Sequence, residues 1–106
     1  MFRDYCSDRM IVQERVGGTP FSRLQPGALA HDRAVEIADE LVESVVDQIV
    51  VRGIFHADLH PGNLILDDER ESDGSSTITL IDFGSVGIVE SSMRRLLVPM
   101  LIGMAN

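Results

Sequence analysis

Residues 56–63, which read HADLHPGN, and residues 82–84, which read DFG, decide how this chain is interpreted. Between them lie two short apolar segments, 63–67 (NLILD) and 77–81 (TITLI), joined by a polar connection. Apolar segments separated by turn-forming residues predict a β-hairpin. A hairpin folds the chain back on itself, so the end of the first motif and the start of the second should meet at its open end.

Three polar residues of these motifs have the spacing that phosphoryl transfer requires. In kinases, an acceptor-orienting carboxylate and a metal-binding Asn share one loop, in the pattern H-x-D-x-x-x-x-N, and D-F-G supplies a second carboxylate for the metal. Asp58 and Asn63 fit the first pattern, and Asp82 begins the second. Asn63 and Asp82 are 19 positions apart, and the hairpin between them brings them together, so their oxygens can bind one cation. We therefore predict that Asp58 is catalytic and that Asn63 and Asp82 bind Mg²⁺.

Each motif residue also has a simpler structural interpretation. Asp58 or Asn63 alone can stabilise a turn through its own backbone, and Phe83 can pack in a core. We expect His56 to pack against the loop and hydrogen-bond it, whereas His60 stays open between a structural and a catalytic role. The two motifs together, at the two ends of one hairpin, favour a metal-assisted site over unrelated turns.

The first motif also allows a different metal site. In an extended segment His56, Asp58 and His60 point to one face. Two imidazoles and a carboxylate suit zinc or iron, so this alternative predicts a metallo-hydrolase or an oxygenase. It leaves the D-F-G motif unexplained.

The segments before the motifs predict one strand and one helix. Residues 10–16 form a short apolar run and predict a strand, which Gly and Pro at 17–20 interrupt. Residues 31–52 have a helical period, with Asp32 as N-cap and Gly53 at the C-terminal end. The expected apolar face holds Ala34, Ile37, Ala38, Leu41, Val45 and Ile49.

The last segment predicts a second helix, at about 92–104, capped by Ser91 or Ser92. It is apolar on most sides, so it needs a partner surface. Pro99 should strain it midway. Together with the hairpin, the two helices predict a mainly helical α+β fold.

Composition excludes several classes of function. The chain has 106 residues, a net charge of -8 and nine basic residues that are all Arg. It therefore lacks the basic stripe of a nucleic-acid-binding protein and does not favour electrostatic docking on anionic lipid. Cys6 is the single cysteine, which excludes an internal disulfide and a thiolate zinc site and fits a reducing, cytosolic setting. The N-terminus is not a signal peptide, and the longest apolar run, 96–103, is far shorter than a membrane span.

Residues 53–68 (GIFHADLHPGNLILDD) and 78–89 (ITLIDFGSVGIV) resemble the AarF/UbiB family of atypical kinases. That family shows a G-x-F-H-A-D-x-H-P-G-N loop and an L-x-D-F-G-x-x-G metal segment. The matching residues are Gly53, Phe55, His56, Ala57, Asp58, His60, Pro61, Gly62, Asn63, Leu80, Asp82, Phe83, Gly84 and Gly87.

A weaker resemblance at 12–18 implies the hinge between two lobes, in which Glu14 and Val16 offer backbone groups to adenine. Gln13 is an unusual polar residue for the back of an adenine pocket. Leu59 stands where the family usually has Pro, and Ser85 stands where it often has Met. Neither of these two departures removes a ligand.

The resemblance implies a partial kinase-like domain over residues 1–106, equivalent to the C-terminal lobe. Its expected parts are the hinge at 10–18, a helix at 31–52, the catalytic loop at 56–63, the metal segment at 82–87 and a helix at 92–104.

The resemblance also implies ATP and Mg²⁺ as cofactors and an ATP-dependent phosphotransferase or ATPase, tied to isoprenoid-quinone or lipid metabolism. The expected partners are a nucleotide, an isoprenoid or lipid small molecule and a missing N-terminal lobe, with no nucleic acid. The expected location is cytoplasmic, with peripheral membrane association of the parent protein.

The family's alanine-rich nucleotide loop, K-x-G-Q signature and phosphate-binding Lys have no counterpart in the chain. We therefore expect the isolated chain to bind ATP weakly and to lack turnover. Only three residues separate Gly87 from the expected helix cap, which is too few for the activation segment that docks a peptide, so we expect no protein substrate.

Two alternatives remain beside this reading. An aminoglycoside- or choline-type phosphotransferase uses a similar H-G-D-x-H-x-x-N loop, although Ala57 and the preceding G-x-F favour the UbiB type. A non-catalytic binding remnant is the other, and its exposed lobe interface should make it oligomerise or aggregate.

Overall fold

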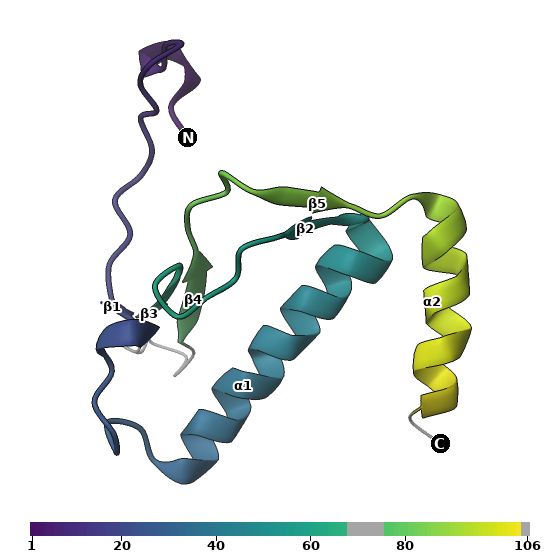
Figure 1. Ribbon diagram of the computed structural model, residues 1–106. Coiled ribbons are helices and arrows are strands. Elements are labelled where there is room, and N and C mark those ends of the chain that lie inside the picture. Colours follow the sequence, from purple (N-terminus) through teal and green to yellow (C-terminus); the bar gives the residue numbers. More distant parts are fainter. Residues whose placement is uncertain (68–75, 105–106) are drawn as a thin grey trace.

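The computed structural model describes residues 1–67 and 76–104 (Figure 1). The elements are the short helical turns η1 (Arg3–Tyr5) and η2 (Phe21–Arg23), the helices α1 (His31–Val46), η3 (Asp47–Arg52) and α2 (Ser91–Met104), and the strands β1 (Thr19–Pro20), β2 (Ile54–His56), β3 (Leu64–Asp67), β4 (Thr77–Leu80) and β5 (Val86–Ile88). Helices and small antiparallel sheets together confirm the predicted α+β class.

The predicted hairpin is present as β3 and β4. They pair antiparallel from Leu64 opposite Leu80 to Asp67 opposite Thr77, and β1 adds to the other edge of β3. The polar connection at 68–75 lies outside the described residues. The hairpin thus brings residue 63 beside residue 81, as the sequence pattern required.

A second antiparallel pair, β2 with β5, was not predicted. His56 lies opposite Val86, and Phe55 lies opposite Gly87. A Cβ atom at residue 87 would overlap the Phe55 ring, so glycine is required at this crossing. This pair places the residues before Asp58 and those after the D-F-G motif side by side.

The predicted helix at 31–52 is confirmed as a helical segment with two parts. Its last six residues, η3, form a π-helical turn, and Gly53 follows with a φ of 70°, as expected of a left-handed C-terminal residue. Asp32 is not the N-cap, because the helix begins at His31 after Ala30, whose carbonyl accepts the Ala34 N–H. Asp32 lies in the first turn instead, where its charge still favours the helix dipole.

The buried face of α1 is narrower than predicted. Ile37 is buried and Leu41 is half-buried, and Leu41 lies across a small cavity from Ile78 and Leu80 of β4. Of the predicted face, Val45 and Ile49 are half-buried, but Ala34 and Ala38 are exposed.

Helix α2 begins at Ser91, so neither Ser91 nor Ser92 is a cap outside it. The residue before the helix is Glu90, whose carbonyl accepts the Arg94 N–H, and the Val89 N–H bonds the Gly53 carbonyl. The bond from Val89 to Gly53 continues the pairing one residue beyond the end of β5, so the helix starts shortly after it. Pro99 lies inside the helix, as predicted.

The predicted strand at 10–16 is wrong. Among the described residues, no strand pairs with residues 11–17, and Met10 makes only an isolated bridge to Ser7. A strand needs a neighbour to satisfy its backbone groups, and this segment runs away from both sheets (Figure 1). The expected interruption at 17–20 instead contains β1, which pairs with β3.

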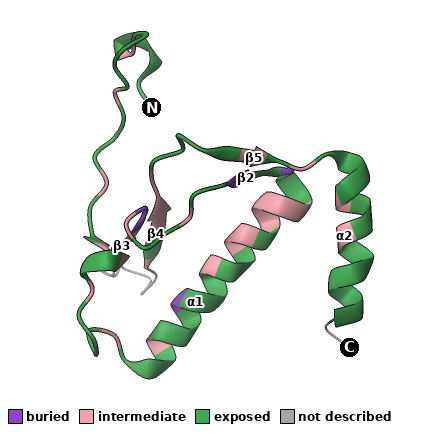
Figure 2. Cartoon of the chain, viewed as in Figure 1, coloured by how far each residue is buried: buried purple, intermediate pink, exposed green. Residues whose placement is uncertain are grey.

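The core is small. In the described part of the chain the buried apolar residues are Ile37, Leu64 and Leu66. The radius of gyration is 16.4 Å, whereas a compact domain of this length would have about 13 Å. Figure 2 shows exposed surface over most of α2 and over the N-terminal segment. Within the described residues, no helix has the length and apolarity to cross a membrane.

Candidate functional site

The loop that carries Asp58 is held between two strand pairs. The Ala57 N–H bonds the Ser85 carbonyl at 3.1 Å, and the Asn63 N–H bonds the His60 carbonyl at 2.9 Å. The first bond extends the β2–β5 pairing, and the second closes the turn before β3. Asp58 therefore lies on a short loop whose two ends are fixed, with its carboxylate largely exposed.

His56 connects the two motifs. It is only 6% exposed, its Nε2 lies 2.9 Å from the Ile81 carbonyl, and its Nδ1 accepts the Asp58 N–H at 3.2 Å. A carbonyl only accepts and an N–H only donates, so Nε2 carries the hydrogen in this arrangement. The ring also contacts Phe83, with centroids 4.8 Å apart. These contacts fit the structural role predicted for His56.

Asn63 lies at the open end of the hairpin. It is 6% exposed, its backbone carbonyl accepts the Ile81 N–H at 2.9 Å, and its Nδ2 donates to the Asp58 carbonyl at 3.1 Å. That side-chain bond uses the nitrogen and leaves the amide oxygen available. Asn63 is thus paired with the residue directly before Asp82.

Asp82 has a φ of 60°, and in the described part of the chain it is the one non-glycine residue with a positive φ. Asp and Asn adopt this conformation more readily than other side chains, and such backbone strain is concentrated at functional sites. Gly84 lies close by, because a Cβ at that position would be 3.2 Å from Oδ1 of Asp82. The conformation turns the chain sharply at the end of the hairpin, before β5.

The available oxygens suit Mg²⁺ better than a soft metal. An amide oxygen and a carboxylate are the hard donors that this ion prefers, with water or phosphate completing its shell. The register of β3 and β4 brings the two residues to one end of the hairpin. Asn63 is buried and Asp82 is exposed, so the assignment of both side chains to one ion stays a prediction.

A cavity of about 810 Å³ joins the N-terminal segment to the D-F-G motif. Its lining includes Gln13, Glu14 and Val16 on one side and residues 79–84 on the other. Among the described residues, none hydrogen-bonds to the backbone of Glu14 or Val16. The cavity therefore brings Glu14, Val16 and Asp82 together, whereas Asp58 and Asn63 do not line it.

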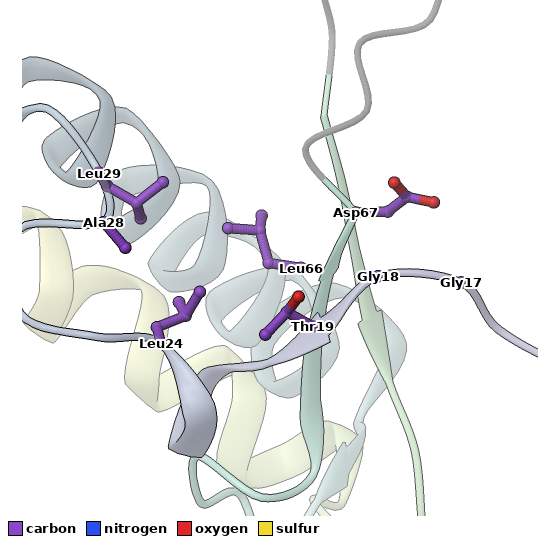
Figure 3. Close-up of a pocket in the computed structure, with 8 residues that line it drawn as sticks. All are labelled: Gly17, Gly18, Thr19, Leu24, Ala28, Leu29, Leu66 and Asp67. Atoms are coloured by element: carbon purple, nitrogen blue, oxygen red, sulfur yellow. The ribbon is translucent and has the colours of Figure 1, made fainter.

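A second cavity, of about 590 Å³, contains no residue of either motif. Figure 3 shows the Leu66 side chain pointing toward Leu24 and Leu29, and the Asp67 carboxylate on the other side of β3. Because it lies apart from the predicted catalytic and metal residues, we take the cavity that contains Asp82 as the candidate site.

The structure does not support a zinc or iron site at His56, Asp58 and His60. Both ring nitrogens of His56 already have backbone partners. In residues 1–67 and 76–104, no three His, Cys, Asp or Glu side chains are grouped to hold a metal ion.

Sequence reasoning missed two features of the site. The pairing of β2 with β5 joins residues about 30 positions apart, and three-residue strands carry too little alternation to be predicted. The positive φ of Asp82 was also missed. An Asp directly after a strand and two residues before a Gly was the available signal.

Comparisons with known proteins identify the family of this chain. A family model described as "ABC1 atypical kinase-like domain" matches residues 1–106. The chain is similar to proteins named "Probable protein kinase UbiB" from Photorhabdus laumondii (30% identical over 106 residues), Klebsiella pneumoniae (31% over 106) and Erwinia tasmaniensis (32% over 109). All of the chain is covered, but it spans only 19% of the length of each relative. No solved structure matches it.

These matches confirm the AarF/UbiB resemblance that the loop and metal-segment motifs carried. The family model covers both motifs, residues 10–18 and both long helices. The chain therefore belongs to the family of ABC1 atypical kinase-like domains.

Proposed function

We propose that the chain forms part of an ATP- and Mg²⁺-binding phosphotransferase or ATPase of the UbiB type. The observation that carries the proposal is the cavity shared by Glu14, Val16 and Asp82. Adenine would lie against the free backbone groups of Glu14 and Val16, and the phosphates would extend toward Asp82. The family match favours this reading over an aminoglycoside- or choline-type enzyme.

The roles of the residues follow from their positions. Asp58, exposed on a fixed loop, would accept the hydrogen bond of the attacking hydroxyl or water and orient it. Asn63 and Asp82 would hold the metal, which when bound neutralises charge on the phosphates. Since the chain has no lysine, a cationic phosphate contact from Lys must come from outside these 106 residues.

The substrate class and the place of action belong to the same proposal. From the AarF/UbiB resemblance we infer that the acceptor is an isoprenoid or other lipid small molecule, which a cytoplasmic protein meets at a membrane surface. Co-sedimentation of the full gene product with liposomes tests the membrane part. A supernatant that retains all the protein at every lipid composition would contradict it.

Two substitutions in the full gene product test the catalytic part. Asp82→Ala should weaken Mg²⁺-dependent ATP binding by roughly tenfold or more, since even residues behind a metal ligand cost 10- to 100-fold in metal affinity. Asp58→Asn should leave that binding intact and lower kcat by about 10²- to 10⁴-fold. Calorimetry gives the first quantity and release of phosphate or labelled product gives the second.

Asp39→Asn, an exposed carboxylate on α1, is the matched control and should change neither quantity. Wild-type behaviour in both test variants would defeat the assignment. If the wild-type gene product binds no Mg·ATP, the non-catalytic alternative replaces the proposal.

A further inference from the structure

The ring of His60 is held in one orientation and one tautomer. The Gly62 N–H donates to His60 Nδ1 at 3.1 Å. An N–H cannot donate to a protonated nitrogen, so Nδ1 presents its lone pair and Nε2 carries the hydrogen. His56 makes the same kind of hydrogen bond: its Nδ1 accepts the N–H of Asp58, which is also two residues further along the chain.

Gly62 also leaves room for the His60 ring. A Cβ at residue 62 would be 2.8 Å from Cε1 and 3.0 Å from Nδ1 of His60. A side chain at that position would push the ring away and break the bond that fixes its tautomer. The Gly62 N–H and the absence of a Cβ at residue 62 therefore both define the ring position.

The hydrogen-bearing nitrogen of His60 faces the predicted catalytic carboxylate. Nε2 lies 4.0 Å from Oδ2 of Asp58, and both side chains are more than half exposed. This separation is longer than a hydrogen bond. Catalytic hydrogen bonds are often long without substrate and shorten in the complex. A small movement of the Asp58 side chain is enough to close the contact.

His56 differs from His60 in what its Nε2 can reach. The Nε2 of His56 is occupied by the Ile81 carbonyl inside the protein, so that ring couples the two motifs. The Nε2 of His60 is directed at a carboxylate on the surface of the loop. The two histidines of the motif therefore have different tasks.

We propose that His60 is a positioning residue for Asp58: its neutral Nε2–H bonds Oδ2 and turns the other carboxylate oxygen toward the acceptor. The inference rests on the proposed function, since it assigns Asp58 as the group that orients the nucleophile. It adds that the orientation depends on the Gly62 N–H and on the glycine at residue 62.

Three variants of the full gene product test this. His60→Leu removes the donor and should lower kcat by roughly 10- to 100-fold, the scale expected when a reacting group is misplaced by about 1 Å. His60→Gln keeps an N–H near the Nε2 position and should retain most of kcat. Gly62→Ala should fall between them. In all three the Kd for Mg·ATP should stay unchanged, because no contact to the nucleotide is lost.

His31→Leu is the matched control, since it makes the same change at an exposed histidine at the start of α1 and should leave kcat unchanged. A kcat of His60→Leu equal to that of the wild type would overturn the inference. So would a kcat of His60→Gln as low as that of His60→Leu, because ring shape rather than the donor would then matter.

A second readout does not depend on turnover. Nitrogen-15 NMR of the histidine rings in the full gene product should show His60 with an unprotonated Nδ1 and a protonated Nε2, and Gly62→Ala should lose this preference. A protonated Nδ1 in the wild type would reject the geometry. Absence of any turnover in the wild type would instead reject the proposed function, so the two failures are distinguishable.

Discussion

The segment from Gly53 to Gly87 and helix α2 use their residues in opposite ways. In the first, buried polar side chains such as His56 and Asn63 are tied to the backbone of neighbouring loops. In α2 the long apolar side chains lie on the surface, with Leu96 70% and Met104 76% exposed, and no described residue of the helix is buried. Polar side chains are thus buried in the described part of the first region, whereas apolar side chains are exposed in the second.

The two regions differ in how much they need contacts from other parts of the protein. In the described residues of the first region, His56 and Asn63 have hydrogen-bond partners, and the His56 N–H also donates to Gln48 of η3, so the geometry of the motifs depends on the end of the long helix as well. Helix α2 contacts η3 and is joined to it by a bond from the Arg94 guanidinium to the Val51 carbonyl. A helix that is apolar on most sides needs further contact to be stable.

The largest effect should come from the core of the hairpin. Leu66, 3% exposed on β3, packs in the small core, so Leu66→Ala should lower the free energy of unfolding by about 2–5 kcal/mol. Leu96→Ala, the same change in α2, should cost less than about 0.5 kcal/mol. Urea unfolding followed by circular dichroism measures both. Equal losses would remove the distinction between the two regions.

A smaller effect should follow at the glycines. Gly53 has a φ of 70°, and a Cβ there would lie 2.9 Å from the Val89 carbonyl. Gly53→Ala should therefore destabilise the chain by roughly 1–3 kcal/mol. Gly103 in α2 has open space around it, so Gly103→Ala should be neutral or slightly stabilising, because Ala favours helix. Thermal unfolding of the two variants measures both effects. A lower melting temperature for Gly103→Ala would contradict the open space around residue 103.

A third test concerns association rather than unfolding. If the apolar face of α2 drives self-association, the double variant Leu96→Glu and Ile102→Glu should shift the 106-residue chain toward monomer with little change in unfolding. Light scattering across a concentration series measures this. As a control, Glu36→Gln on the exposed side of α1 should leave the distribution unchanged. A wild-type chain that is already monomeric at high concentration would show that the exposed face is tolerated.

The smallest effect should come from the exposed ion pair between Asp47 and Arg52 in η3. The Asp47 side chain, through its hydrogen bond and its charge, raises the pKa of Arg52 above its ordinary value. A group whose pKa is higher in the folded state than in the unfolded state stabilises the fold at every pH below its unfolded pKa. This stabilisation is lost only as the pH rises through the folded pKa, which is strongly alkaline for Arg. Arg52→Gln should therefore leave the pH dependence of the melting temperature between pH 5 and 9 unchanged.

How much the sequence predicts depends on whether the cause is local. The β3–β4 hairpin, the helical segment before Gly53 and the left-handed glycine were predictable, because turn residues and apolar periodicity lie within each element. The β2–β5 pair was not, because it joins three-residue strands from segments about 30 positions apart. Glu14 and Val16 could be named as adenine contacts only through resemblance, and that role stays a prediction. Among the described residues, no strand pairs with residues 11–17, whose contacts are local, such as the Phe2 N–H to the Val12 carbonyl. The prediction of a strand there failed for that reason.

Pro99 has one more consequence for whatever packs on α2. Proline has no amide hydrogen, so the carbonyl of Arg95, one turn earlier, lacks its helical donor. An unsatisfied carbonyl sealed under apolar side chains is costly. A protein or lipid surface that covers this side of the helix must therefore leave a water channel to Arg95 or supply a donor of its own, which purely hydrocarbon contact cannot do.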